Sequence, residues 1–299
     1  MLIEQWQQEK DTLHHLAQIL GKYTLVAAYQ EPQWEHVMLD INVQGFSTGL
    51  LHDKSHDFSI AVNLMKHRIE IIVDNNYHEI LLQHGQSIKF YYESITQILN
   101  DEGVDLVINT TPQEVADHTP FEKNNHLHHY NEAIAEEVLS IMKFAYNAES
   151  SFINPLRTRK IKPGLFWGTF DISCIIVSDI YQPFGDKTMP IEEAAFDEQM
   201  IEFGFWFGDD HFEGPTFFVL PYPFSNQKFE CHQDFPSGSH YNEQLGEFIM
   251  ETQDFSKDNI KNIERFFEES FNIFKNYLEW KDCTHYFIPL NMRHNHLKN

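Results

Sequence analysis

The chain has 299 residues, enough for one large fold or for two domains of average length. Apolar residues make up 42% of it and charged residues 22%, a composition typical of a globular protein rather than a fibrous or disordered one. Its 45 acidic residues outnumber its 21 lysines and arginines, so the formal charge is −24. Nucleic acids and anionic membranes bind clustered cations. We therefore expect neither as a partner.

The cysteines and the chain start point to a reducing compartment. Cys174, Cys231 and Cys283 lie far apart, and no CxxC pair occurs. The first ten residues are polar and lack the basic-then-apolar order of a secretory signal. No stretch reaches the roughly 18 consecutive apolar residues of a membrane helix. These features predict a cytoplasmic protein without a disulfide framework or a thiolate zinc site.

The first half of the chain opens with a helical pattern and continues with the period of strands. Apolar residues at helical spacing predict a helix from Glu4 to about Leu20, which Gly21 would end. A second helix follows Ser87, and residues 104–108 are predicted as a strand. Alternating apolar and polar residues are typical of an antiparallel sheet with one buried face. Four segments show this alternation or can extend it: 37–43, 58–64, 69–73 and 78–82.

The second half repeats this broad plan after a long irregular segment. Residues 109–130 lack any period and contain prolines, asparagines and histidines, so they predict a connecting loop. A helix is predicted from Glu132 to about Tyr146, and a closing helix after Ser256. Strands are predicted at 165–178, 200–207 and 215–222.

The expected fold class is α+β, with antiparallel sheets, packed helices and two halves of similar helix–strands–helix order. We expect one unit over residues 1–299, divided into an N-terminal half 1–110, a connecting loop 111–130 and a C-terminal half 131–299.

Common cofactor and hydrolase motifs are missing. The sequence has no GxGxxG after a strand and no GxxxxGK[ST], the two glycine-rich patterns that cradle phosphates. It also lacks the GxSxG nucleophile turn and the HExxH zinc pair. We therefore expect no cofactor.

A group of histidines precedes the third predicted helix. Imidazoles such as those of His126, His128 and His129 could bind zinc or nickel. No carboxylate or thiol stands at a fixed helical offset to complete such a site. The interpretation that we favour is a solvated histidine-rich loop, and no metal site is expected.

Cations are scarce in this acidic chain, and four of them lie together: Arg157, Arg159, Lys160 and Lys162. No aromatic residues are interleaved with them, which disfavours a nucleic-acid surface. We favour a patch that complements acidic groups of the protein itself. The alternative is a site for an anionic ligand group.

A polar row follows one side of the first predicted helix. His14 and Gln18 are four residues apart, and Lys22 comes just after Gly21. An imidazole, an amide and an ammonium in a row could bind a carboxylate or a phosphate. The alternative is a hydrogen-bonded row that joins the helix to the sheet.

Two aromatic segments stand out in the second half. In the segment 166–171, alternation places Trp167, Thr169 and Asp171 on the same face. A carboxylate beside an indole in an apolar strand is either paired or functional. The segment 203–208 resembles the first in composition. The alternative for both is an aromatic sheet core.

Several of these patches occur in an order that resembles an uncharacterised bacterial family known only as a domain of unknown function. The resemblance covers about residues 10–280 and implies one family-length unit without an assigned activity. The family pattern has a histidine just before its FWG patch, where this chain has Lys162-Pro163-Gly164-Leu165. The patches are TLHxxxQIxGK from Thr12 to Lys22, FWGTFD from Phe166 to Asp171, GFW from Gly204 to Trp206 and LGEF from Leu245 to Phe248.

The resemblance favours six polar or aromatic residues as a site: His14, Gln18, Lys22, Trp167, Asp171 and Glu247. Our first hypothesis is a pocket for a small polar or anionic molecule between the first helix and the FWGTFD strand. His14 or Asp171 would act as a general base, and Trp167 would stack on the ligand. Gln18 and Lys22 would hold an anionic group, and Glu247 would complete the lining. The sequence leaves open whether the protein is an enzyme.

Two alternatives belong to other classes of function. A non-catalytic interaction module or homodimer would use the aromatic segments or a strand edge as its surface. It predicts a large exposed aromatic face and no enclosed pocket. A metal-dependent hydrolase would instead use Asp171, Glu247 and histidines.

Overall fold

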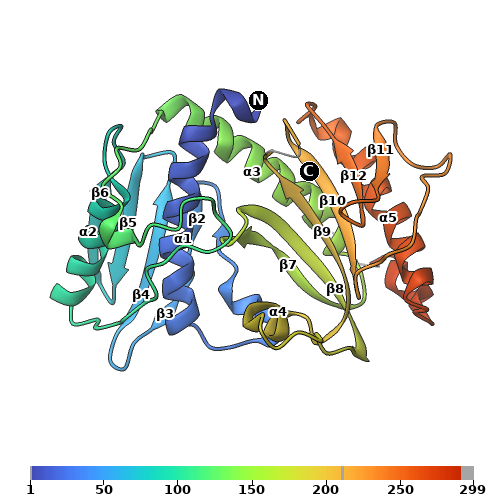
Figure 1. Ribbon diagram of the computed structural model, residues 1–299, viewed down its shortest axis with the longest axis horizontal. Coiled ribbons are helices and arrows are strands. Elements are labelled where there is room, and N and C mark those ends of the chain that lie inside the picture. Colours follow the sequence, from blue (N-terminus) through green and yellow to red (C-terminus); the bar gives the residue numbers. More distant parts are fainter. Residues whose placement is uncertain (1, 210–211, 291–299) are drawn as a thin grey trace, which may run out of the picture.

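Two antiparallel sheets of six strands each form the frame of the protein, seen in a computed structural model that describes residues 2–209 and 212–290 (Figure 1). Helix α1 (Gln7–Ala27) lies where the two sheets meet. The mixture of helices and antiparallel sheets confirms the predicted α+β class.

The first sheet has the strand order β1-β2-β4-β5-β6, with β3 paired to β4. Phe58, Ile60 and Val62 are buried and alternate with more exposed residues, as the sequence predicts. Helix α2 (Ile88–Asp101) begins where the hydroxyl of Ser87 accepts a hydrogen bond from the amide of Phe90. The strands are β1 (Asp40–Ile41), β2 (Gly45–Ser47), β3 (Leu51–His52), β4 (Asp57–Asn63), β5 (Arg68–Val73) and β6 (Asn76–Leu81).

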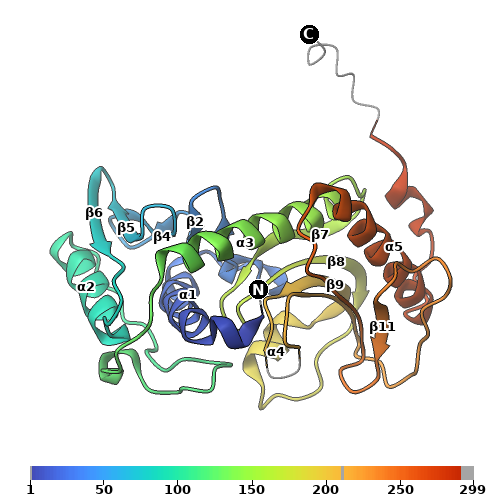
Figure 2. The same ribbon diagram turned by 90° about the horizontal axis from the view of Figure 1, so that it is seen from above.

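The second sheet has the order β11-β12-β10-β9-β8-β7. Helices α3 (Glu132–Ile153) and α5 (Ile260–Tyr277) pack on one face of it, and their phenylalanines interlock with those of β9. Figure 2 shows α3 running across this sheet towards the first half. The short helix α4 (Pro190–Ala195) contacts the 3-10 helix at 32–37. The strands are β7 (Arg159–Phe166), β8 (Asp171–Tyr181), β9 (Glu198–Trp206), β10 (Thr216–Tyr222), β11 (Ser239–Asn242) and β12 (Glu247–Glu251).

The two halves share one hydrophobic core. Leu20 of α1, Phe46 of the first sheet and Phe203 of the second sheet belong to the same cluster of buried side chains. Leu39 and Leu165 also join the halves, since each amide donates to the other's carbonyl at 2.9 Å. The described structure also contains short 3-10 helices outside the sheets: η1 (Ile3–Gln5), η2 (Pro32–Val37), η3 (Phe121–Lys123), η4 (Lys257–Asn259) and η5 (Cys283–Phe287).

Some predicted boundaries are wrong, for reasons that lie in the tertiary structure. Gly21 does not end the first helix, which continues to Ala27. The glycine lies against the ring of Trp167, where a Cβ would not fit, so its reason is packing rather than a helix stop. The segment 165–178 is a hairpin rather than one strand, and its turn separates β7 from β8. In the described part of the chain, residues 104–108 are not paired as a strand. None of the described helices is long and apolar enough to cross a membrane.

Candidate functional site

The polar row of α1 holds the turn between β7 and β8. His14 Nε2 donates to the carbonyl of Gly168 at 2.8 Å and lies 3.1 Å from that of Trp167. Gln18 Nε2 donates to the same two carbonyls, at 3.1 and 3.0 Å. Burial lowers the pKa of His14 to about 4, although its carbonyl partners oppose this shift. His14 is therefore a neutral donor at neutral pH.

Lys22 and Trp167 continue this row into the core. Both side chains are 1% exposed, and the Lys22 ammonium lies 5.1 Å from the centre of the Trp167 ring. Lys22 also donates to the side-chain carbonyl of Gln113. Burial lowers its pKa to about 8, opposed by the nearby Glu114 carboxyl. These contacts are those of the alternative in which the row joins the helix to the sheet. A ligand-holding role for Gln18, Lys22 and Trp167 stays a prediction.

The turn that the row holds has a strained residue at its end. Phe170 has a φ of 63°, in the left-handed region that a bulky side chain rarely adopts. Its amide donates to the carbonyl of Phe166 at 2.9 Å, and its ring stacks on His14 with 5.3 Å between centres. The turn thereby brings Thr169 and Phe170 to the surface of a pocket beside α1.

This cavity, the α1 pocket, has a volume of about 510 Å³ and lies where the sequence predicts one, between the first helix and the FWGTFD segment. Five segments line it: the first two turns and a half of α1, the loop 114–117, residues 127–129, the β7–β8 turn and residues 206–209. Its polar lining consists of Gln7, Gln8, Lys10, Asp11, His14, His15, Glu114, Asp117, His128, His129, Thr169 and Asp209.

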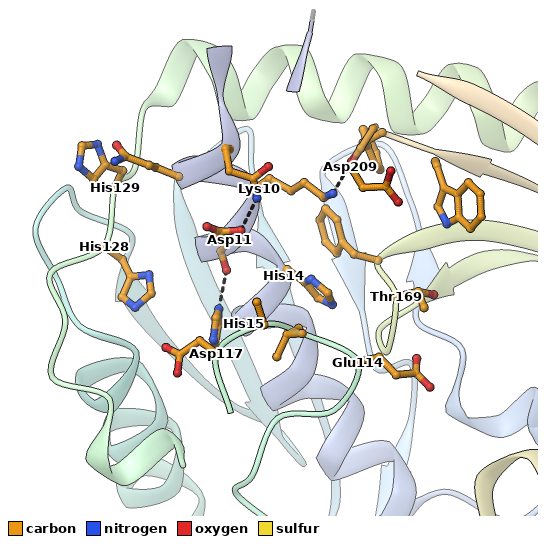
Figure 3. A pocket seen from close by; sticks show the side chains of 18 of the residues that line it. Lys10, Asp11, His14, His15, Glu114, Asp117, His128, His129, Thr169 and Asp209 are labelled. Carbon is orange, nitrogen blue, oxygen red and sulfur yellow. Dashed lines mark hydrogen bonds between the residues drawn. The ribbon is translucent and has the colours of Figure 1, made fainter. Parts of the chain in front are cut away.

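Charged and titratable side chains lie at two opposite sides of the α1 pocket. Figure 3 shows Lys10 extending towards Asp209 at one side. The Lys10 ammonium donates to the carbonyl of Gly208 there. His15, His128 and Asp117 lie at the other side of the same view.

Glu114 lies on the border between the α1 pocket and a second cavity of about 260 Å³. Burial and the negative charge of Asp171 raise its pKa to about 7. Thr169 and Trp206 also line both cavities. The two cavities are therefore neighbours with a common wall.

The second cavity contains the predicted residue Asp171. Strand register places Asp171, Ser173 and Glu202 on the same face of the sheet. Asp171 accepts a hydrogen bond from the hydroxyl of Thr169. Burial raises the pKa of Asp171 to about 6 and that of Glu202 to about 8, and the charge of Asp171 adds to the rise at Glu202. Two neighbouring carboxyls that titrate near neutral pH are suited to proton transfer.

The six predicted site residues do not line one cavity. His14 lines the α1 pocket and Asp171 lines the second cavity. Of the other four, none lines either cavity as the described residues define them: Gln18, Lys22, Trp167 and Glu247. Glu247, at the start of β12, is 9% exposed, and burial raises its pKa to about 8. In the described structure its Oε2 has no hydrogen-bond partner.

The cationic patch at 157–162 serves the protein's own acceptors. The Lys160 ammonium donates to three carbonyls at the C-terminal end of helix α3, those of Ile153, Asn154 and Leu156, at 2.6–2.8 Å. Arg159 pairs with Glu198. Across residues 2–209 and 212–290, no group of three or more histidine, cysteine or acidic side chains is arranged to hold a metal ion.

Comparison with known proteins gives a family but no activity. The chain matches the model of a family of unknown function, DUF5996, over residues 1–285. It belongs to this family. The predicted resemblance to a family-length unit of unknown function is thus confirmed. None of the curated proteins and none of the solved structures matches this DUF5996 chain.

Sequence reasoning passed over several residues of the α1 pocket in this DUF5996 chain. His15 directly follows a predicted site residue, but it lies one position off the row defined by His14 and Gln18. His128 belongs to the segment that the sequence interprets as a solvated loop. It is half-buried, and its ring centre lies 5.4 Å from that of His15. The unusual number of histidines in 118–129 was the signal that could have found it.

The buried carboxyls predict that the protein loses stability as the pH rises above neutral. Burial raises the pKa of Glu202 and of Glu247 to about 8, so the folded state keeps protons that the unfolded state releases. Their contribution to stability is fully present below about pH 4.3 and is lost as the pH rises through the folded values. His14 and His128, whose pKa burial lowers to about 4, oppose this trend only below about pH 6.5.

Between about pH 6.5 and pH 8, the free energy of unfolding is therefore expected to fall by about 2–3 kcal/mol. Calorimetric melting at constant ionic strength would measure it as a Tm decrease of about 4–10 °C. A Tm that stays constant or rises over this range would contradict the raised carboxyl pKa values.

Proposed function

We propose that this DUF5996 protein binds a small polar molecule in the α1 pocket. The observation that carries the proposal is the convergence of five chain segments on one cavity, with His15, which is only 4% exposed, in its wall. Among the described residues, none forms a hydrogen bond to Nε2 of this ring. A buried polar atom without a partner costs free energy that a ligand can recover by bonding to it.

The aromatic segments support this proposal over the interaction module. Trp167, Phe203, Phe205 and Phe207 are each at most 1% exposed, so they form core rather than an exposed face. The large side chains that are exposed, such as Tyr29, Leu50 and Val107, come from separate segments. The interaction-module hypothesis does not require a pocket, whereas the small-molecule hypothesis does, and the structure has the α1 pocket.

A filled pocket tests the proposal. Ala116 is exposed and lines the α1 pocket, so Ala116→Trp is expected to place an indole in its mouth without disturbing the core. Saturation-transfer NMR with a library of small polar metabolites should detect binders of the wild type that this variant no longer binds. Ala133→Trp, on the exposed face of α3, is the matched control and should keep them. A library in which Ala116→Trp changes no binder would refute the α1 pocket as the site.

Catalysis, if the bound molecule reacts, is assigned to the predicted pair. Asp171 lines the neighbouring cavity rather than the α1 pocket, so it would transfer the proton through the hydroxyl of Thr169, which lines both cavities and donates to Asp171. The pKa of Asp171, about 6, lies near working pH, and His14 would orient the β7–β8 turn beside it. Asp171→Asn keeps the shape of the side chain. A metabolite that the variant binds but no longer converts would support this role, whereas conversion at the wild-type rate would make Asp171 structural.

A further inference from the structure

The hydrogen bonds around His15 fix which of its nitrogens can receive a ligand. His15 Nδ1 lies 2.7 Å from the backbone carbonyl of Asp11, and a carbonyl only accepts, so Nδ1 carries the proton. In the neutral imidazole Nε2 is therefore the acceptor. Within the described residues it has no partner, and His15 lines the α1 pocket.

A chain of three side chains fixes His128 in the same way. The Asn124 amide donates to Asp117 Oδ2 at 3.2 Å, which orients its oxygen towards His128. His128 Nε2 lies 3.2 Å from that oxygen and must donate to it. Burial lowers the pKa of His128 to about 4, so the ring is neutral and Nδ1 is its acceptor.

Asp117 adds a negative charge beside the two rings. Burial acts to raise its pKa, but hydrogen bonds from the side chain and the amide of Thr119 outweigh this effect, and the pKa falls below its ordinary value. Asp117 therefore stays a carboxylate at neutral pH. The ammonium of Lys10 extends to the opposite side of the pocket, where it donates to the carbonyl of Gly208 (Figure 3).

We infer that the end of the α1 pocket formed by His15, His128 and Asp117 binds the protonated primary amine of a small molecule. An ammonium carries three donors and one positive charge. The two imidazole lone pairs and the carboxylate are three acceptors with one negative charge, and the ring centres lie only 5.4 Å apart. The Asp117 carboxylate would repel an anionic group at this end of the pocket. This inference rests on the proposed function and names the ligand class of that site.

Three probes that differ only in their head group test the inference: butylamine, butan-1-ol and butyrate. Titration into protein with ¹⁵N-labelled histidine should show saturable shifts of His15 Nε2 and His128 Nδ1 with butylamine. Butan-1-ol is expected to bind at least about tenfold more weakly, because a hydrogen bond to a charged donor is the stronger one. Butyrate is expected to leave both nitrogens unchanged.

Matched variants test whether butylamine binds at His15 and Asp117. His15→Phe removes the acceptor but keeps a ring, and should weaken butylamine binding at least about tenfold. Asp117→Asn removes the charge and should weaken it as well, which keeps the test informative if His15→Phe does not fold. His126→Phe changes an exposed histidine of the same segment that does not line the described pocket, and should bind as the wild type does.

The outcomes separate the two proposals. Equal or tighter binding of butan-1-ol or butyrate at these nitrogens would overturn the amine inference and leave the α1 pocket as a binding site. Stoichiometric binding of Zn²⁺ alone by the two rings would overturn it in favour of a metal. If Ala116→Trp also changes no binder of the metabolite library, the proposed function itself fails.

Discussion

Replacing Gly21 with alanine is expected to lower the free energy of unfolding by about 2–3 kcal/mol, as overpacking of a rigid core does. In an ordinary helix interior the same change stabilises a protein by about 0.5–1 kcal/mol. Here an added Cβ would lie only 2.1 Å from Cγ of Trp167. The indole is 1% exposed and lies beneath the ammonium of Lys22, so it has little room to move. Urea unfolding followed by circular dichroism would measure the loss.

Two further variants show whether the contact with Trp167 is the cause. Gly185→Ala is the matched control, since within the described structure an added Cβ there has no atom within 4 Å. The double variant Gly21→Ala with Trp167→Leu should lose less than the sum of the single losses, because the smaller side chain relieves the overlap. A Gly21→Ala protein more stable than the wild type would show that α1 and the β7–β8 turn are not packed this closely.

Replacing Glu149 with methionine is expected to stabilise the protein by about 1–3 kcal/mol, the desolvation cost of an unsatisfied buried polar group. Glu149 lies in α3, is 0% exposed and faces the second sheet. Neither of its carboxyl oxygens has a hydrogen-bond partner in the described part of the chain. Burial, together with the charges of Asp171 and Glu202, raises its pKa well above the ordinary value. Methionine has a similar length and no charge to bury.

The stabilisation by Glu149→Met should depend on pH in a defined direction. Because the folded pKa is raised, the wild-type carboxyl costs little near pH 4 and increasingly more as the pH rises. The gain in unfolding free energy should therefore be larger at pH 8 than at pH 5. Glu137→Met, at an exposed position of the same helix, is expected to change stability by less than about 0.5 kcal/mol at either pH. A destabilised Glu149→Met protein would show that the carboxyl has a role that the hydrogen bonds do not reveal.

The repeating elements of this fold are readable from the sequence because their cause is local. The alternation of Phe58, Ile60 and Val62 with polar neighbours follows from a strand that buries one face. The cap at Ser87 is equally local, and the structure has it. Gly21 is the instructive failure, since only a tryptophan far along the chain explains why the helix has a glycine at this position.

The residues of the candidate site also differ in whether a local sequence pattern or only a tertiary contact reveals them. His14 could be predicted because its neighbours form a recognisable patch, and it does line the α1 pocket. The importance of His15 could not, because its free nitrogen is evident only once the bond from Nδ1 to Asp11 is known. The role of His128 depends on the orientation of Asn124, which Asp117 sets through space. No spacing pattern encodes such a chain of hydrogen bonds.

The bond between α1 and the β7–β8 turn has a consequence for how the protein is made. A separation of 153 residues divides His14 from Trp167 in the chain. At about 5–20 residues per second, the ribosome needs on the order of ten seconds to produce the partner of a helix that it has already released. Throughout that interval the face of α1 that binds the β7–β8 turn has no partner, and the α1 pocket does not yet exist. The first half of the protein can therefore complete its packing only after the second half has been made.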